Sequence, residues 1–366
     1  MTDRSIRLCP EDILSGAAAR DAIARGRALP LAGGPLAFAA VETLERGADR
    51  SAASHFLTLA ELKDWAARTG RATEIEATLE TLSAPRPTWA GFVLDRPLVM
   101  GILNITPDSF SDGGAFYAPA RALDHGRAMI EAGADIIDIG GESTRPGSDA
   151  TPIEEELRRV VPIIERLARD GAVISIDTRH TAVMRAALDA GARIVNDVTA
   201  LTGDGGSMAL VARSDAPVVL MHMAGEPRTM QQEPRYDDVA LDVLDYLEAR
   251  VAACEGAGIS RANIVVDPGI GFGKHPVEHN PQLLRRIAVL HATGCAILLG
   301  LSRKSFIGRV SRDEPPQQRL AGSIAGALWG AGRGVQILRV HDVAETRQAL
   351  AVYRAILDAQ PGAVAK

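Results

Sequence analysis

Eight short runs of apolar residues recur along the chain from residue 98 onward, and each ends on or beside a polar residue. Short apolar runs bounded in this way are typical of buried parallel strands, which are covered on both faces. The runs are Leu98–Ile105, Ala134–Ile139, Val173–Ile176, Arg193–Val195, Val218–Met221, Ile264–Val266, Ala296–Leu301 and Val335–Val340. The polar residues at their ends are Asn104, Glu142–Arg145, Asp177, Asn196 with Asp197, His222, Asp267, Ser302–Lys304, and Arg339 with His341.

The segments between these runs have helical character. In the second of them, Ile153–Arg169, apolar residues fall on one helical stripe with Glu and Arg opposite. The predicted helices are Pro119–Ala132, Ile153–Arg169, Thr181–Ala190, Ser207–Arg213, Asp237–Gly256, Pro281–Thr293, Gln317–Gly332 and Val343–Leu357.

Repeated strand–helix units favour a parallel sheet with right-handed crossovers. An open doubly wound sheet would gather its chemistry at one switch point, whereas here polar residues follow every strand. We therefore predict an α/β fold, with a TIM (β/α)8 barrel over residues 96–366 and its active site at the carboxyl ends of the strands.

Residues 1–95 differ from the rest and are predicted to form an N-terminal α/β extension of unknown role. Leu36–Leu44 is a candidate strand, and capping boxes at Thr58–Glu61 and Thr73–Glu76 are expected to open two short helices. Pro85–Pro87 indicates a linker, followed by a short strand or hairpin, Trp89–Leu94, at the lower mouth of the barrel. No cluster of catalytic residue types occurs in this part of the sequence.

Composition bears on which classes of binding partner the protein can have. The formal charge is −6, from 40 Lys and Arg against 46 Asp and Glu, without a basic block, so nucleic acid is not expected as a partner. No apolar stretch reaches membrane-spanning length, and the first residues do not form a signal sequence, so we expect no membrane association. Three dispersed cysteines without metal-ligand spacing indicate buried thiols in a reducing cytoplasm.

Three polar acceptors, Asp177, Asn196 and Asp267, follow the third, fourth and sixth predicted strands. Carboxylates at the ends of buried strands are costly without hydrogen-bond donors. A flat ligand with several N–H groups on one edge, such as an aminopyrimidinone ring, would supply those donors. Alternatively, each acid caps the following helix or bonds within its own loop. Convergence of three such residues favours a binding pocket.

Lys304, Arg339 and His341 follow the last two strands, where barrels of this class usually bind phosphate. Arg339 and His341 are two positions apart and so point to the same side, an arrangement that suits a diphosphate. An ion pair of Arg339 with Asp342 or with a carboxylate in the barrel is the alternative.

Two long glycine-bearing loops follow the first and second strands, and we expect them to act as lids. Asn104, at the start of the first loop, offers an amide oxygen to Mg²⁺, with phosphate oxygens and water as further ligands. The segment Gly269–Lys274 lacks the spacing of a Walker phosphate loop, and its glycines are expected to let the backbone approach a flat ligand beside Phe272.

Taken together, these segments resemble the dihydropteroate synthase family of pterin-binding enzymes over residues 98–350. The resemblance rests on six motifs in the same order, and one departure is His275, where Thr is common. The motifs are Met100–Gly114, Asp138–Gly147, Met221–Met223, Asp267–Lys274, Ser302–Ser305 and Arg339–Asp342.

The resemblance implies condensation of 6-hydroxymethyl-7,8-dihydropterin diphosphate with 4-aminobenzoate to give 7,8-dihydropteroate and diphosphate, by a cytoplasmic homodimer that uses Mg²⁺. Asp177, Lys304 and Asn104 would be catalytic, with Asn104 also holding the metal. The implied substrate contacts are Asp177, Asn196, Met221, Asp267, Phe272 and Lys304 for the pterin, Arg339 and His341 for the diphosphate, and Thr144, Arg145, Pro146 and Ser302 for the aminobenzoate.

Two other functions remain as alternatives at this point. A methyltetrahydrofolate-dependent methyltransferase would use the same pterin pocket but needs neither the Ser143–Pro146 loop nor the Arg339 and His341 pair. A non-catalytic pterin-binding homologue is expected to have lost Asn104, Asp177 or Lys304, and all three are present.

Overall fold

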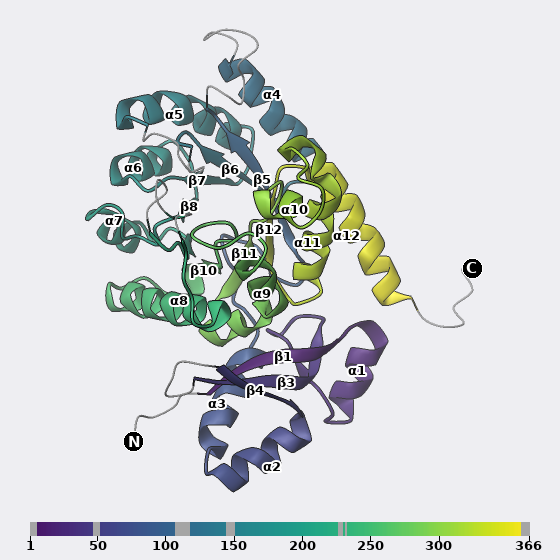
Figure 1. The fold of residues 1–366 in the computed structure, drawn as a ribbon. Helices are drawn as coiled ribbons and strands as arrows, with labels where there is room; N and C mark the ends of the chain where they lie inside the picture. Colours follow the sequence, from purple (N-terminus) through teal and green to yellow (C-terminus); the bar gives the residue numbers. More distant parts are fainter. Residues whose placement is uncertain are drawn as a thin grey trace.

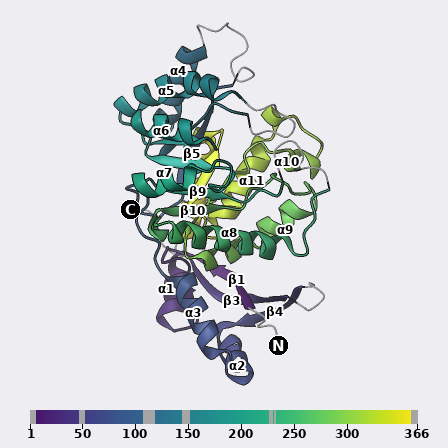
Figure 2. The same ribbon diagram turned by 90° about the vertical axis from the view of Figure 1, so that its left-hand side faces the viewer.

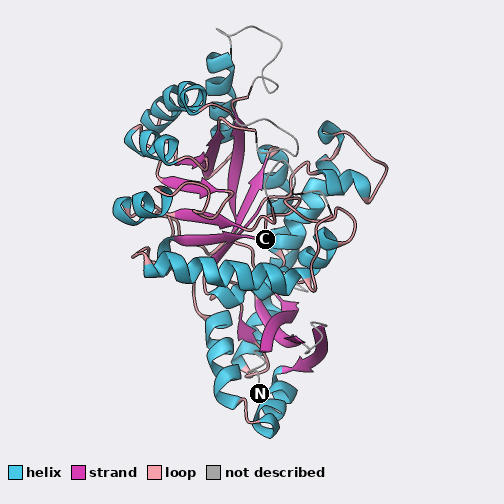
Figure 3. Cartoon of the chain, turned by 60° about the vertical axis from the view of Figure 1, so that its left-hand side comes forward, coloured by secondary structure: helices cyan, strands magenta, loops and turns pink. Residues whose placement is uncertain are grey.

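The computed structural model describes residues 6–46, 52–106, 118–143, 151–225, 230 and 233–359. Eight parallel strands close into a barrel in the order β10-β11-β12-β5-β6-β7-β8-β9, and the helices that connect them form an outer ring (Figures 1 and 3). The predicted TIM barrel is therefore confirmed. Its strands are β5 (Leu98–Asn104), β6 (Ile136–Gly140), β7 (Ile174–Asp177), β8 (Ile194–Asp197), β9 (Val218–Met221), β10 (Ile264–Asp267), β11 (Ala296–Leu299) and β12 (Ile337–Val340).

The helices of the outer ring follow the predicted segments closely. They are α4 (Ala118–Glu131), α5 (Ile153–Arg169), α6 (Thr181–Asp189), α7 (Ser207–Ser214), α8 (Val239–Gly256), α9 (His279–Arg285), α10 (Ser305–Arg309), α11 (Leu320–Ala331) and α12 (Val343–Asp358), with 3₁₀ helices η2 (Arg261–Asn263), η3 (Ile287–Thr293) and η4 (Pro316–Gln318). Among the described residues, no helix combines the length and the apolar character needed to cross a membrane.

The prediction of one helix over Pro281–Thr293 is wrong. The chain forms α9 and then η3, with Arg286 between them in a non-helical conformation. The side chain of Arg286 contacts Glu42 of the N-terminal sheet and Asp238 at the start of α8. These two ion pairs hold Arg286 at the junction of the two helices.

The first part of the chain forms an antiparallel sheet that lies below the barrel, with α2 farthest from it (Figures 1 and 2). The strand predicted at Leu36–Leu44 is present as β3, and the sequence reasoning missed β1 and α1. The elements are β1 (Ile6–Leu14), α1 (Gly16–Ala24), β2 (Leu29–Pro30), β3 (Ala37–Arg46), β4 (Ala52–Thr58), α2 (Leu59–Thr69) and α3 (Ala72–Ser83).

One of the two predicted capping boxes is confirmed. The Thr58 hydroxyl accepts from the backbone N–H of Glu61, and the Glu61 carboxylate accepts from the backbone N–H of Thr58. The second prediction is wrong in detail, because α3 already begins at Ala72 with Arg71 as its N-cap. Glu74 instead accepts from the backbone N–H of Ile6, which ties this helix to β1.

Trp89 closes the lower mouth of the barrel, as the sequence predicted for the segment Trp89–Leu94. A backbone bridge joins Trp89 to Phe92 in a tight turn. The Trp89 side chain is fully buried against the first residues of the strands, including Leu98 and Ile337, and its indole N–H donates to the carbonyl of Asn263 at 3.0 Å. The floor of the barrel is therefore supplied by the residues just before β5.

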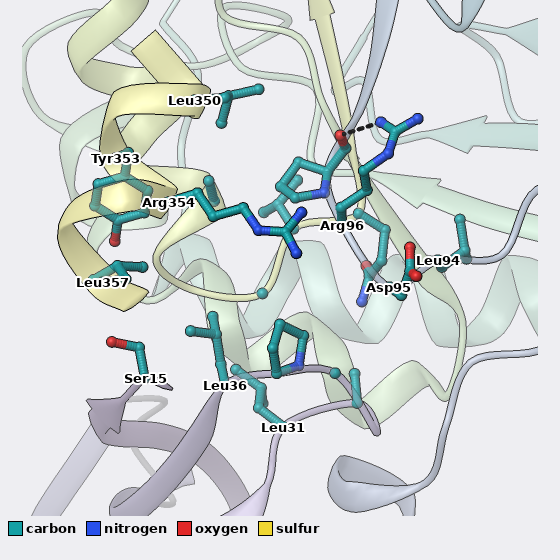
Figure 4. A pocket seen from close by; sticks show the side chains of 18 of the residues that line it. Ser15, Leu31, Leu36, Leu94, Asp95, Arg96, Leu350, Tyr353, Arg354 and Leu357 are labelled. Atoms are coloured by element: carbon teal, nitrogen blue, oxygen red, sulfur yellow. Dashed lines mark hydrogen bonds between the residues drawn. The ribbon is translucent and has the colours of Figure 1, made fainter. Parts of the chain in front are cut away.

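A cavity of about 410 Å³ lies between the N-terminal sheet and the barrel floor (Figure 4). Leu31 and Leu36 enter it from the sheet, and Leu350 and Leu357 enter it from α12. None of the candidate site residues lines this cavity, because the carboxyl ends of the strands lie at the opposite end of the barrel.

The N-terminal sheet is joined to the barrel by a buried carboxylate on β3. Glu42 is 2% exposed and accepts from Arg286 at 2.7 and 3.0 Å and from Arg285 at 3.3 Å. Burial opposes its ionisation, but the arginines outweigh burial and hold the pKa of Glu42 below its ordinary value.

We expect Glu42→Ala to lower the free energy of unfolding by about 3 kcal/mol at neutral pH, because Arg286 then loses its main partner. Because the folded pKa is lowered, this stabilisation is present above the ordinary pKa of Glu and is lost as the pH falls through the folded pKa. Urea unfolding at pH 7 and pH 3.5 measures both effects. Exposed Glu80→Ala is the control, expected to change stability by less than about 0.5 kcal/mol. Equal effects of the two variants at pH 7 would contradict this role of Glu42.

Candidate active site at the carboxyl ends of the barrel strands

The strand register places three of the candidate residues in one row, together with Gly140. Asn104 pairs with Gly140, Gly140 with Asp177, and Asp177 with Asn196, across β5, β6, β7 and β8. These residues are the last or nearly the last of their strands, so they stand together at the carboxyl mouth of the barrel. Polar residues that follow separate apolar runs in the sequence thus become neighbours at the ends of adjacent strands.

Arg339 of β12 reaches across this mouth and bridges two carboxylates. Its Nε donates to Asp138 Oδ2 and one of its terminal nitrogens donates to Asp177 Oδ2, both at 2.6 Å. The amide of Asn196 donates to the same oxygen of Asp138 at 3.1 Å. Side chains from four strands therefore form one connected network.

The charges in this network are nearly enclosed by protein. Burial raises the pKa of Asp177, and the Asp138 carboxylate adds to this effect, whereas the Arg339 guanidinium opposes it. Burial also opposes the charge on Arg339, but the two carboxylates outweigh it and raise the pKa of Arg339. Arg339 therefore stays a cation, and its charge opposes the effect of burial on the pKa of the Asp177 carboxyl group.

The sequence left two roles open for Arg339, binding of a diphosphate or an ion pair with a carboxylate. The structure shows the ion pair. The partners are the barrel residues Asp138 and Asp177, whereas Asp342 pairs with Arg303. Contact of Arg339 with a diphosphate stays a prediction, and would require its guanidinium to share its donors or turn outward.

Asp138 is the residue that the sequence reasoning missed as a member of the site. It lies in the middle of β6, is fully buried, and its Oδ1 has no hydrogen-bond partner among the described residues. A charged residue inside the apolar run Ala134–Ile139 was the available signal, because such a residue needs a buried partner.

A second group of site residues surrounds Lys304. Asp267, at the end of β10, is 5% exposed and accepts from the backbone N–H of Gly269 at 2.7 Å. The Lys304 ammonium donates to the carbonyl of Ile270 and lies 4.5 Å above the centre of the Phe272 ring. Burial lowers the pKa of Lys304 to about 8, and the nearby Asp267 carboxylate opposes this shift.

Both groups belong to one site, because the charges of Asp177 and Asp267 both act on Lys304 and on Arg339. Met221 is buried in the register position opposite Asp267. The three predicted acceptors and two of the predicted cations are therefore brought together at one end of the barrel.

Ser302 and His341 form a contact at the edge of the site. The Ser302 hydroxyl accepts from the backbone N–H of His341 at 3.2 Å and contacts His341 Nδ1 at 3.0 Å. The sequence assigned Ser302 to the aminobenzoate and His341 to the diphosphate. Because the two side chains are in contact, the predicted binding sites for the aminobenzoate and the diphosphate would lie next to each other.

Asn104 and Asp177 lie on either side of Gly140. A Cβ atom built on Gly140 would lie 3.5 Å from Asn104 Oδ1 and 3.5 Å from the Cβ of Asp177, so the glycine lets these two side chains approach each other at the carboxyl mouth. The amide oxygen of Asn104 is an oxygen donor of the kind that a hard divalent cation binds.

The two predicted lid loops are only partly described. The structure describes the first loop up to Thr106, and Thr144, Arg145 and Pro146 of the second loop lie outside the described residues. The flanks of the second loop are joined by Glu142, which accepts from Arg179 at 2.9 and 3.0 Å and from the backbone N–H of Thr151 at 3.2 Å.

Two glycines of the segment Gly269–Lys274 are required by packing within the protein, and the expected approach of this backbone to a flat ligand stays a prediction. A Cβ atom at Gly269 would lie 1.9 Å from the carbonyl oxygen of His222, and one at Gly273 would lie 2.4 Å from that of Ala224. Both have positive φ angles, +64° and +60°. The loop after β10 is therefore packed directly onto the segment that follows β9.

Comparison with known proteins identifies the family to which this chain belongs. Residues 100–341 match the family model described as pterin binding enzyme, which covers the whole carboxyl mouth described above. The chain belongs to the pterin binding enzyme family. Its N-terminal sheet lies outside the matched residues.

Relatives and solved structures named dihydropteroate synthase match most of the chain. The chain is 47% identical to the dihydropteroate synthase of Escherichia coli (strain K12) over 268 residues, 73% of this chain and 94% of that protein. Its structure is similar to that of Xanthomonas albilineans dihydropteroate synthase with 4-aminobenzoic acid, with 50% identity, a TM-score of 0.70 and coverage of 75% of this chain and 99% of the other. The complex of the Xanthomonas albilineans enzyme with 7,8-dihydropteroate has 47% identity, a TM-score of 0.68, and coverage of 75% and 100%.

We expect the Lys304 amine to titrate near pH 8, and Asp267→Asn to lower its pKa further because the variant removes the carboxylate that favours the charged form. The measurement is the rate of acetylation of Lys304 as a function of pH, followed by mass spectrometry, with the exposed Lys63 as internal reference. A midpoint above pH 10, or a higher midpoint in Asp267→Asn, would contradict the burial described here.

Proposed function

We propose that this chain catalyses the dihydropteroate synthase reaction. It joins 6-hydroxymethyl-7,8-dihydropterin diphosphate to 4-aminobenzoate and releases 7,8-dihydropteroate and diphosphate. The observation that carries the proposal is the convergence of Asp177, Asn196 and Asp267 with Lys304 and Arg339 at one end of the barrel. Family membership and the names of the matching relatives support the same reaction.

In the proposed complex, the pterin lies across the barrel mouth with its N–H groups toward the acceptors. Arg339 occupies one oxygen of Asp138 and one of Asp177, and the unpartnered Oδ1 of Asp138 is a further buried acceptor. Phe272 and Met221 supply apolar surface for the ring, and the Lys304 ammonium donates to its carbonyl side. Hydrogen-bond donors on the ligand would offset the cost of these buried acceptors.

In the proposed reaction, the bond between the pterin methylene carbon and the diphosphate oxygen breaks, and the aryl amine forms the new carbon–nitrogen bond and loses a proton. Positive charge develops on the pterin as the diphosphate leaves. We propose that the Asp177 carboxylate stabilises that charge, and that His341 and Arg339, once Arg339 shares its donors or turns outward, neutralise the leaving group. Thr144, Arg145, Pro146 and Ser302 are proposed to form the aminobenzoate side and to exclude water.

We propose that Mg²⁺ assists the reaction, held by Asn104. The position of Asn104 as the last residue of β5, at the carboxyl mouth, supports this, and a single protein ligand is sufficient because Mg²⁺ keeps several waters and substrate oxygens. When bound, the cation would reduce the negative charge of the departing diphosphate.

The proposed setting is a homodimer in the cytoplasm. The family resemblance supports the dimer. The burial of all three thiols, Cys9, Cys254 and Cys295, is compatible with a reducing compartment.

The direct test is the formation of dihydropteroate by the purified chain from pterin diphosphate and 4-aminobenzoate, with and without Mg²⁺. We expect product only when both substrates are present, and activity that depends on Mg²⁺. Asn104→Ala is expected to lower kcat/KM about tenfold or more and to raise the Mg²⁺ concentration needed for half activity. A chain that binds pterin but forms no product would be the non-catalytic homologue, and the proposal would be wrong.

Asp177→Asn is expected to lower kcat about 100-fold, because the variant keeps the shape of the side chain and removes the charge facing the developing cation. The KM for the pterin substrate is expected to change by less than about threefold, since the amide oxygen still accepts a hydrogen bond. Exposed Asp189→Asn, on α6, is the control. Small and equal effects of Asp177→Asn on kcat and KM would contradict a role of Asp177 in the chemical step.

A further inference from the structure

Lys274 is a fully buried lysine that the proposed reaction does not use. It directly follows the glycine loop after β10, and its side chain has no exposed surface. No carboxylate forms an ion pair with it among the described residues. A buried lysine in such surroundings needs another set of partners, because an unsatisfied buried ammonium is very costly.

The partners of Lys274 come from two adjacent loops. Its Nζ lies 2.9 Å from the carbonyl oxygen of Gly269 and 3.0 Å from that of Phe272, both in the loop after β10. It also lies 2.9 Å from Nδ1 of His222, the first residue after β9. One nitrogen atom therefore joins the two ends of the glycine loop to the neighbouring strand.

This arrangement satisfies Lys274 in either protonation state. As an ammonium it donates three hydrogen bonds, to the two carbonyls and to the Nδ1 lone pair of His222. As a neutral amine it donates two, and His222 Nδ1–H donates to the amine lone pair. Burial lowers the pKa of Lys274 and that of His222, so the contact does not depend on a permanent charge beneath the site.

The loop held by Lys274 carries contacts to two candidate pterin residues. The backbone N–H of Gly269 donates to Asp267, and the carbonyl of Ile270 accepts from Lys304. The Phe272 ring lies 4.5 Å beneath the Lys304 ammonium. The positions of Asp267 and Lys304 therefore both depend on the conformation of this loop.

His222 is itself held in place from the opposite side. Its ring meets Tyr246 edge to face with centroids 4.9 Å apart. The hydroxyl of Tyr236 donates to the carbonyl of Gly273 at 2.7 Å and so fixes the end of the same loop. Contacts with Lys274, Tyr236 and Tyr246 thus hold His222 and the end of the loop together.

We propose that Lys274 and His222 are positioning residues, which fix the loop Gly269–Gly273 so that Asp267 and Lys304 meet the pterin. This inference rests on the proposed function for its substrate, and it assigns the pair no contact with the substrate. It predicts a selective loss of pterin binding when the pair is broken, whereas general destabilisation would affect both substrates.

The first test is Lys274→Met, which keeps an unbranched side chain as long as the lysine stem to Cε and removes the terminal nitrogen with its hydrogen bonds. We expect the KM for pterin diphosphate to rise about tenfold, with less than about a twofold change in the KM for 4-aminobenzoate. Acetylation of Lys304 at pH 7 is expected to become several-fold faster, because its contacts with Ile270 and Phe272 loosen. The matched control is Lys63→Met, an exposed lysine on α2, expected to change neither quantity.

His222→Phe provides a second variant if Lys274→Met does not fold. It keeps an aromatic ring against Tyr246 and removes both ring nitrogens, including the Nδ1 that meets Lys274. We expect the same selective change, about threefold in the KM for the pterin substrate. The double variant is expected to lose no more than Lys274→Met alone, because both changes break one network. Additive effects would contradict the proposal.

The labelling of Lys304 separates this inference from the proposed function, since it requires no enzymatic activity. If the wild type has no synthase activity but Lys304 is acetylated faster in Lys274→Met, the positioning role is supported and the proposed reaction is wrong. Synthase activity in the wild type, with both KM values and the Lys304 labelling rate unchanged in Lys274→Met, would overturn the positioning role and retain the reaction.

Discussion

The contact of Arg339 with Asp138 and Asp177 organises the carboxyl mouth of this barrel. Three charged side chains from β6, β7 and β12 meet there, with Asp138 buried and Asp177 and Arg339 partly exposed, and each would be costly alone. The planar guanidinium has several donors in one fork, so a single residue can meet two carboxylates on neighbouring strands at 2.6 Å each. This pairing offsets the cost of placing Asp138 and Asp177 inside an apolar barrel. It also determines which of their carboxylate oxygens remain available to a ligand.

The rest of the site is arranged around that network. Strand register brings Asn104 and Asn196 into the row of Asp177. Asp267 at the end of β10, Phe272 in the loop after β10 and Lys304 after β11 form the other part of the site. The polar atoms beneath this loop are paired through Lys274 and His222. The strands thus fix one half of the site rigidly, whereas the other half depends on how one glycine-rich loop is held.

The sequence predicted the barrel well because its strands are buried on both faces and read as apolar runs with polar ends. It predicted Asp177, Asn196 and Asp267 for the same reason, since each directly follows such a run. Three features escaped it. Asp138 lies within an apolar run, and its partner Arg339 is 201 residues away in the chain. The break at Arg286 follows from ion pairs with distant elements, and β1 contains Pro10 and lacks a regular alternation.

A crystal structure of this protein with the pterin substrate tests the central claim most directly. The account predicts that the N–H edge of the ring contacts Asp177, Asn196 and Asp267, while Asp138 and Arg339 remain paired or Arg339 turns toward the diphosphate. A ring bound elsewhere, with the carboxyl mouth empty and all three acceptors still facing only protein, would contradict it.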